Sequence, residues 1–244
     1  MDVVESKNLS DSFIRRIVKA SFANCSIEDR ALLSKSKCIF PISMGQTKQE
    51  GSKLLATMLL ISNTFKECDL LLTDSLQRHT LKIDLPDASP QALYSESRAM
   101  GNRWLDNNRD IYEKLTIPFN MIRWDYWLDY PDFNEYHAKI NHLYDKNKEF
   151  KAAIDKSVAE YLDRRYQGQQ RTAQAFAACV DYLKEESTVI VLFTLINQYN
   201  FEIYPNKRST SIDATYRHFI LPYYPHLLKP LSIRFFKGAV TKHA

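Results

Sequence analysis

Residues 37–65 read KCIFPISMGQTKQEGSKLLATMLLISNTF, and this stretch predicts a strand, a tight turn and a long helix. The segment from Cys38 to Ile42 contains branched and aromatic side chains, which favour a buried strand. Pro41 lacks an N–H and therefore indicates a bulge or an irregular strand end. After the turn, apolar residues recur at helical spacing: Leu54, Leu55, Met58, Leu59 and Ile61.

The turn between this strand and this helix contains Ser43, Met44 and Gly45. Open α/β sheets bind ligands outside the carboxyl ends of their strands. The N–H groups of a helix N-terminus can stabilise a developing oxyanion. Ser43 is therefore a candidate nucleophile, although most strand–Ser–Gly turns are only turns.

A second apolar run, from Cys68 to Asp74, has the length of a strand and ends in polar residues. A strand, a helix and a second strand of this size form a βαβ unit, so we predict a sheet that begins parallel and right-handed. Asp74 should then reach the same sheet edge as Ser43.

Periodicity assigns the rest of the chain. Ser10 and Asp11 can cap a short helix with Phe13, Ile14, Ile17 and Val18 on one face, and residues 91–115 form a polar helix. The further predicted elements are a third strand from Phe119 to Trp127, two helices within 132–166, a helix at 169–186, a run at 187–199 ambiguous between helix and strand but favoured as helix, and strands at 201–204 and 231–236.

Composition favours one domain spanning residues 1–244. The chain is 45% hydrophobic and 25% charged, and its five glycines and nine prolines form no linker. The four cysteines lie in apolar segments without a CxxC pair, which is typical of reduced thiols in a cytoplasmic protein. The longest apolar run, Val189 to Ile196, is too short to span a membrane. A net charge of +4 permits an anionic partner without requiring one.

Other residues could carry chemistry, and each has a plain structural alternative. Tyr182 and Glu186 share one helix face at a spacing of four, where a solvated pair is common. Tyr204 precedes Pro205 at a strand end. The basic residues at 148–171 and 207–237 are by default solvated charge. The sequence has no phosphate-binding loop, no dinucleotide-binding motif and no zinc-ligand spacing, so we expect no metal and no cofactor.

These motifs occur in the order of a known family. A Ser ends the first predicted strand, a Tyr-x-x-x-Glu motif follows about 140 residues later, and a Tyr-Pro lies eighteen residues beyond the Glu. The ordered set resembles the tRNA-dependent cyclodipeptide synthases over residues 37–236. The chain has Gln46 three residues after the Ser and Tyr204-Pro205 later, so it looks like a member of the Tyr-Pro (XYP) subfamily.

The resemblance implies a single Rossmann-like α/β domain with a parallel central sheet flanked by helices. This fold is similar to the catalytic domain of class I tyrosyl- and tryptophanyl-tRNA synthetases. The substrates would be two aminoacyl-tRNAs. Ser43 would attack the first aminoacyl ester, Tyr182 and Glu186 would hold the α-amino group, and Tyr204 would lie near the reacting centre. No His is placed by sequence as the base for Ser43, so a hydroxyl of the leaving tRNA can relay the proton.

Further site residues follow from the same resemblance. The pocket for the first side chain would be lined by Ile39, Pro41, Leu71 and Val189, and N–H groups around Gly45 are the candidate oxyanion site. The family grips tRNA with a basic helix, whereas the matching helix here, 91–115, is sparsely basic. We therefore spread the tRNA-binding prediction over Arg98, Arg103, Arg164, Arg165 and Arg171.

Two other functions remain open from the sequence. One is a serine acyltransferase or hydrolase that uses Ser43 on an activated ester other than aminoacyl-tRNA. The other is a catalytically inactive module that binds tRNA or protein. We expect a cytoplasmic monomer without membrane association.

Overall fold

The computed structural model of this chain describes residues 16–166 and 172–239, which build one six-stranded sheet in the order β1-β6-β5-β2-β3-β4. All neighbouring strands are parallel except β1 and β6. The strands are β1 (Arg16–Phe22), β2 (Lys37–Ile42), β3 (Glu67–Leu72), β4 (Phe119–Arg123), β5 (Phe201–Tyr204) and β6 (Lys229–Ala239).

The order winds in two directions from β2, because β3 and β4 lie on one side of it and β5 and β6 on the other. This is the doubly wound arrangement of a Rossmann-like fold, which confirms the predicted α/β class. The predicted βαβ unit is present as β2, a helix and β3, with Lys37 paired to Glu67 and Ile42 paired to Leu72.

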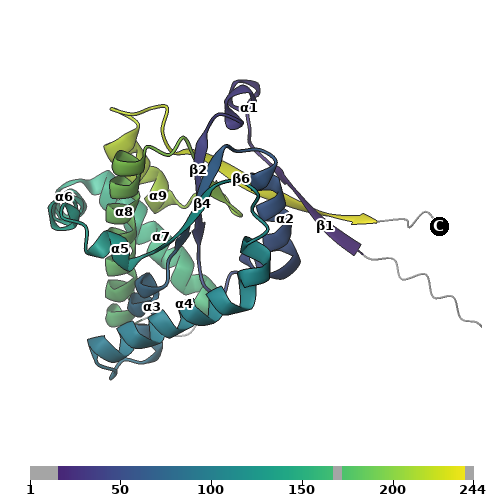
Figure 1. The fold of residues 1–244 in the computed structure, drawn as a ribbon. Coiled ribbons are helices and arrows are strands. Elements are labelled where there is room, and N and C mark those ends of the chain that lie inside the picture. Colours follow the sequence, from purple (N-terminus) through teal and green to yellow (C-terminus); the bar gives the residue numbers. More distant parts are fainter. Residues whose placement is uncertain (1–15, 167–171, 240–244) are drawn as a thin grey trace, which may run out of the picture.

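Helices cover both faces of the sheet (Figure 1). In the view of Figure 1, α2 lies to one side of the strands, and α8 stands on the other side with α6 and α7 near it. The α-helices are α1 (Ile27–Leu33), α2 (Gly51–Ser62), α3 (Arg78–Asp84), α4 (Pro90–Tyr112), α5 (Asp125–Leu128), α6 (Phe133–Lys146), α7 (Lys148–Tyr166), α8 (Ala173–Asn197) and α9 (Thr210–Thr215), with short 3-10 turns at Thr47–Gln49 and Ser75–Gln77 and a π-helical turn at Tyr216–Ile220.

Strand alternation separates two apolar cores. Cys38, Phe40 and Ile42 point to the core that contains α2 and α4. Ile39 belongs to the core on the opposite face, which contains Val189 and the middle of α8. A third cluster joins α6, α7, α8 and α9. In such a sheet, covered on both faces, ligands bind outside the carboxyl ends of the strands.

Helix α8 is continuous across the two segments predicted separately at 169–186 and 187–199. It begins after Thr172, whose hydroxyl accepts from the Ala175 N–H at 3.0 Å, and it ends at Gln198 in a left-handed conformation. No proline or glycine interrupts it, and its second half is buried almost all round. The predicted helical character of 187–197 is therefore confirmed.

Two sequence predictions are wrong in part. The helix expected from Ser10 is not continued at Ile17 and Val18, because Arg16–Phe22 is a strand that pairs with β6; residues 10–15 lie outside the described residues. The third strand stops at Arg123, and Asp125–Leu128 is helical. Trp124 and Trp127 are both buried, and a helical turn brings side chains three residues apart to one face.

Candidate active site

Ser43 and Tyr204 meet where the winding of the sheet reverses. Ser43 directly follows β2, Tyr204 is the last residue of β5, and these two strands are neighbours. The Ser43 Oγ lies 3.3 Å from the Tyr204 Oη, and either hydroxyl can donate. Such a switch point is the usual ligand site of an open α/β sheet.

The turn after Ser43 depends on a glycine. Gly45 has a φ of 74°, and the Gln46 N–H donates to the Ser43 carbonyl at 3.4 Å. A positive φ at the third position is the mark of a type II turn, which L side chains rarely adopt. Among the described residues, the Ser43 N–H donates to the Gln49 Oε1 at 2.8 Å, while the N–H groups of Met44 and Gly45 have no acceptor. These two amides are free to bind an oxyanion.

A cavity of about 1230 Å³ opens beside this turn. It is lined by Ser43, Gly45, Gln46 and Tyr204 from the sheet edge. One face of α8 forms the opposite wall, with spacings of three and four that keep the side chains in a single stripe: Cys179, Tyr182, Leu183, Glu186, Ile190 and Phe193. The structure thus brings Ser43, Tyr182, Glu186 and Tyr204 to one cavity.

Glu186 is recessed in this cavity with no cationic partner among the described residues. Burial, together with the nearby charge of Glu202, raises its pKa to about 8. Glu202 is itself held by Arg208, whose Nε donates to the Glu202 Oε2 at 2.9 Å. The Arg208 guanidinium is therefore already engaged, which leaves Glu186 ready to take a proton or an ammonium group.

Two of the three tyrosines that line the cavity, Tyr182 and Tyr204, are neutral phenols at physiological pH. Burial raises the pKa of Tyr182 well above its ordinary value, and the Glu186 charge adds to this. Burial also raises the pKa of Tyr204, partly offset by its hydrogen bond with Ser43. Each phenol can therefore donate a hydrogen bond or pass on a proton.

One end of the cavity is apolar. Pro41 and Leu71, two of the residues predicted to line the pocket for the first side chain, line the cavity here, and that role stays a prediction. Ile39 and Val189 are fully buried and lie in the core next to it. Ile39 precedes Pro41 by two residues in β2, so it lies about 6–7 Å farther along the strand from the sheet edge at Ser43. The other apolar side chains at the cavity wall are Trp124, Ile190 and Phe193.

A buried charge network that the sequence did not single out supports this wall. The Glu185 carboxylate accepts from the Arg78 Nη1 at 2.8 Å and from the Trp124 Nε1 at 2.8 Å, and it lies 3.0 Å from the His79 Nε2. Burial alone would raise the pKa of Glu185, but the hydrogen bonds from His79 and Arg78 outweigh it and lower the pKa to about 2. The network ties α3 and Trp124 to α8.

Asp74 follows β3 at the same sheet edge as Ser43, as predicted, but it faces α4. Its buried carboxylate accepts from the Arg123 Nε at 2.7 Å and from the Arg98 Nη1 at 3.2 Å. Arg98 also pairs with Asp125 at 2.5 Å. Arg98, proposed from the sequence as a tRNA contact, therefore has two carboxylate partners inside the protein.

The other predicted tRNA contacts lie in different places. Arg103 is exposed on α4 and pairs with Glu96 at 2.8 Å. Arg164 and Arg165 are at the end of α7 and line the main cavity, where Arg165 pairs with Asp84. Arg171 lies outside the described residues.

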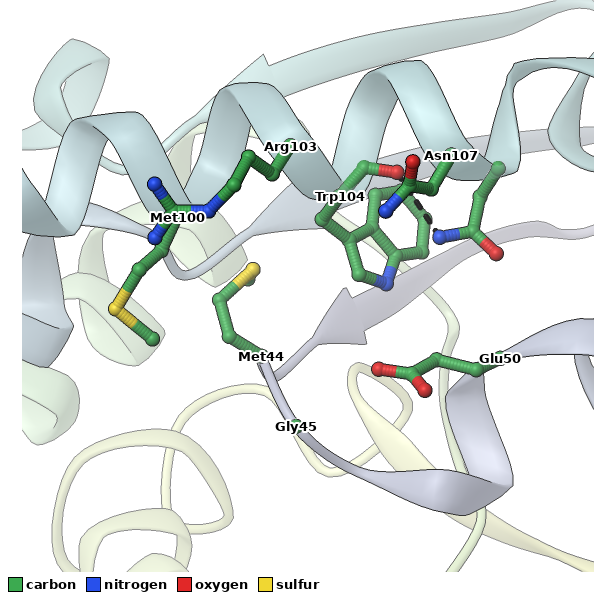
Figure 2. A pocket seen from close by; sticks show the side chains of 8 residues that line it. Met44, Gly45, Glu50, Met100, Arg103, Trp104 and Asn107 are labelled. Carbon is green, nitrogen blue, oxygen red and sulfur yellow. Dashed lines mark hydrogen bonds between the residues drawn. The ribbon is translucent and has the colours of Figure 1, made fainter.

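A second, smaller cleft of about 310 Å³ lies between the Ser43 turn and α4 (Figure 2). In Figure 2, Trp104 and Asn107 extend from α4 toward Met44 and Gly45, with Glu50 beyond the turn. Met44, Gly45 and Met100 line both this cleft and the main cavity. The turn that follows Ser43 thus separates the smaller cleft from the main cavity.

The described residues lack several other kinds of site and segment. None of the residues that line the main cavity is a histidine. No group of three or more His, Cys, Asp or Glu side chains among the described residues could hold a metal ion. No helix in the described part of the chain is long and apolar enough to cross a membrane. The four cysteines are free, three of them buried.

No protein-family model matches the sequence, and no curated protein matches it. Among solved structures, a CDPS from Fluoribacter dumoffii is 40% identical, covers 91% of this chain and all of its own, and superimposes with a TM-score of 0.87. A cyclodipeptide synthase from Candidatus Glomeribacter gigasporarum bound to Phe-tRNAPhe is 21% identical, with 89% and 95% of the two chains covered and a TM-score of 0.65.

A third structure, from Mycobacterium tuberculosis, is described as showing that cyclodipeptide synthetases are related to type I tRNA synthetases. It is 12% identical, covers 91% of this chain and 94% of its own, and has a TM-score of 0.62. At this identity the likeness concerns the fold alone. The similarity at 40% identity extends over nearly the whole chain.

Proposed function

This chain belongs to the cyclodipeptide synthase (CDPS) family, and we propose that it joins two aminoacyl groups, each delivered as an aminoacyl-tRNA, into a cyclic dipeptide by covalent catalysis at Ser43. The observation that carries this mechanism is the meeting of the Ser43 and Tyr204 hydroxyls, 3.3 Å apart, in a cavity that also contains Glu186. The ester of an aminoacyl-tRNA is already activated, so the transfer needs neither ATP nor a metal.

In the first step the Ser43 Oγ attacks the ester carbonyl of the first aminoacyl-tRNA. The Ser43 proton passes through Tyr204 to the 3′-terminal ribose oxygen, and the tRNA leaves with a free hydroxyl. The N–H groups of Met44 and Gly45 stabilise the oxyanion. The product is an aminoacyl ester on Ser43, which divides one difficult transfer into easier steps.

Glu186 holds the α-amino group of this aminoacyl ester and then takes its proton. An α-amino group has an ordinary pKa of about 7.7–8.0, close to the value of about 8 at Glu186. A base whose pKa lies near the operating pH transfers protons most effectively. Tyr182, one helical turn earlier on α8, donates a hydrogen bond at the same place.

The freed amine attacks the ester of the second aminoacyl-tRNA, which forms an amide bond and releases the second tRNA. The new terminal amine then attacks the carbonyl of the Ser43 ester. This closes the diketopiperazine ring and returns the Ser43 hydroxyl. The apolar end at Pro41 and Leu71 receives the first side chain, so we expect an apolar first residue.

Four further proposals complete this function. Gln46 and Tyr204-Pro205 assign the chain to the XYP subfamily. Residues 1–244 act as one catalytic domain and as a monomer, since one cavity of one chain contains the four catalytic side chains. The protein works in the cytoplasm, where aminoacyl-tRNAs are made. Arg103, Arg164, Arg165 and Arg171 contact tRNA, while Arg98 holds Asp74 and Asp125.

Mass spectrometry of culture medium from expressing cells tests the function. The wild-type chain should release a new cyclic dipeptide, and Ser43→Ala should abolish it, whereas Ser52→Ala, an exposed serine of α2, should not. A cyclic dipeptide that persists in Ser43→Ala would refute the covalent mechanism. Soluble wild-type protein that yields no product, yet is acylated on Ser43 by a simple ester, would favour the acyltransferase alternative.

A further inference from the structure

Gln49 makes an unusual pair of contacts beside the nucleophile. Its side chain is 0% exposed. Its Oε1 accepts from the Ser43 N–H at 2.8 Å, and its Nε2 donates to the Pro41 carbonyl at 2.6 Å. The Gln49 side-chain amide therefore bridges the backbone groups of the two residues that flank Ile42, at the end of β2.

The direction of these groups follows from the β2–β3 ladder. The Ile42 carbonyl accepts from the Thr73 N–H at 2.9 Å and from the Thr73 Oγ1 at 3.0 Å, so it faces β3. Backbone groups alternate along a strand. The Pro41 carbonyl and the Ser43 N–H therefore face the other neighbour, β5.

On that side the backbone pairing stops early. Cys38 pairs with Phe201 and Ile39 with Glu202, and the same register places Pro41 opposite Tyr204. In a parallel ladder, Pro41 would donate to the residue before Tyr204, and its carbonyl would accept from the residue after it, Pro205. Both prolines lack an N–H, so the ladder cannot continue.

We infer that Gln49 is a positioning residue for Ser43. The side-chain amide of Gln49 replaces the missing backbone pairing between β2 and β5. The inference rests on the proposed function of Ser43. The amide supplies the donor that Pro205 cannot give and an acceptor for the Ser43 N–H. It lets the two strands separate at the point where Ser43 and Tyr204 meet, while the backbone before the nucleophile stays fixed.

This arrangement also selects the oxyanion donors. The Ser43 N–H is occupied by Gln49, so only the next amides in the turn remain for the substrate carbonyl. Those amides keep their direction only while Ser43 is anchored. Loss of the anchor should therefore slow acylation of Ser43 more than it weakens tRNA binding.

The experiment measures single-turnover acylation of the full chain by a mixture of aminoacylated tRNAs, followed by mass spectrometry of the Ser43 peptide. Gln49→Leu keeps a similar volume but removes both hydrogen bonds. We expect the acylation rate constant to fall about 10²-fold, the cost typical of a small misplacement. The affinity for aminoacyl-tRNA and the circular-dichroism spectrum should not change.

Gln49→Glu supplies a rescue that separates positioning from folding. In this variant the protonated carboxyl group can accept from Ser43 and donate to Pro41, whereas the ionised carboxylate cannot donate. The ratio of variant to wild-type rates should thus fall as pH rises, among molecules shown to be folded at each pH. The other charged and titratable groups of the turn, the start of α2 and the cavity are present in both proteins, so the ratio reports the added carboxyl group and its effect on them: Lys48, Glu50, Lys53, Glu186, Glu202 and Tyr204.

Gln91→Glu, an exposed change on α4, is the matched control and should show a flat ratio. If Gln49→Leu acylates like the wild type, or if the Gln49→Glu ratio does not vary with pH, the inference is wrong while the proposed function stands. If Gln49→Leu does not fold, the Gln49→Glu ratio decides. A wild-type chain that never acylates Ser43 would overturn both.

Discussion

Glu185 and Glu186 are consecutive residues of α8, yet their carboxyl groups have pKa values of about 2 and about 8. One helical step turns Glu185 toward Arg78 and His79 and turns Glu186 into the cavity. Both side chains are largely removed from solvent, so the difference comes from their partners. One carboxylate is held by Arg78 and His79, and the other has no cationic partner among the described residues.

Glu186→Gln should stabilise the protein at high pH. The pKa of Glu186 is raised from 4.5 to about 8, so the folded state binds more protons than the unfolded state in this range and loses stability as pH rises through it. The variant should gain on the order of 4–5 kcal/mol over the wild type at pH 9 and nothing at pH 4. Urea unfolding at both pH values measures this.

The same variant should lose turnover. Without the carboxylate, the α-amino group has neither its anchor nor its base, and general base catalysis is worth about 10²–10⁴-fold. The remaining rate should lack the wild-type rise near pH 8. Full turnover with unchanged pH dependence would show that Glu186 has no such role.

Glu185→Gln should act in the opposite direction. It leaves the Arg78 guanidinium partly buried without its carboxylate, which typically costs about 3–5 kcal/mol. Since the pKa of Glu185 is lowered, the wild type gains this stability above pH 4.5 and loses it as pH falls toward 2. Thermal unfolding of both proteins between pH 2 and 7 should show the gap closing at acid pH. A constant gap would contradict the assigned charge.

Tyr204→Phe should slow the chemistry without unfolding the chain. It removes the hydroxyl 3.3 Å from the Ser43 Oγ and therefore the proposed proton path, a loss of about 10²-fold in kcat. Tyr199→Phe is the control, because this buried phenol donates to Asp69 at 2.5 Å away from the reacting groups. It should lower stability but leave the rate of Ser43 acylation unchanged.

Gly101→Ala should destabilise the packing of α4 on the sheet edge. A Cβ at this position would lie 2.6 Å from the Asp74 Cβ and 2.9 Å from the Arg123 Nη2, so the helix must shift, at a cost of about 1–3 kcal/mol. Gly51→Ala offers a contrast, because its Cβ would meet open space and only its φ of 54° is strained. Denaturant midpoints of the two variants compare crowding with backbone strain.

Arg103→Ala should weaken binding of aminoacyl-tRNA and reduce its salt dependence. A cation that neutralises one phosphate contributes about one unit to the slope of log affinity against log salt. Arg109→Ala is a matched control on the same helix, where the arginine pairs with Asp106 at 3.4 Å. Equal losses in both variants would mean that the general charge of α4, rather than Arg103, attracts tRNA.

The sequence predicted the elements whose patterns are local. The strand before Ser43, the helix after Gly45 and the first half of α8 have clear periodicity, whereas the second half of α8 is buried almost all round and fitted a strand as well as a helix. The strand at Arg16–Phe22 was missed because its partner, β6, is more than two hundred residues away. Its apolar residues fit either period over such a short segment.

The supporting contacts had no local signal at all. Gln49 is one polar residue in a polar turn, and only the three-dimensional register shows that it replaces backbone pairing at Pro41. Likewise, nothing in the sequence near Arg78 indicates that its partner is Glu185, more than one hundred residues away. Long-range polar pairs depend on which faces the packing brings together, and a single sequence does not contain that information.

Consecutive turns of helix α8 contribute the proposed amine-binding residue and the apolar side chains that would contact the first amino-acid side chain. Glu186 is the proposed amine site, and the apolar side chains Ile190 and Phe193 line the same cavity one and two turns later on α8. Because the two functions are on one rigid rod but not on the same residues, a substitution at position 190 or 193 can change which amino acid fits while the amine stays in place. Under the proposed function, single substitutions at these two positions should therefore change the product of this chain while the chemistry at Ser43 is kept.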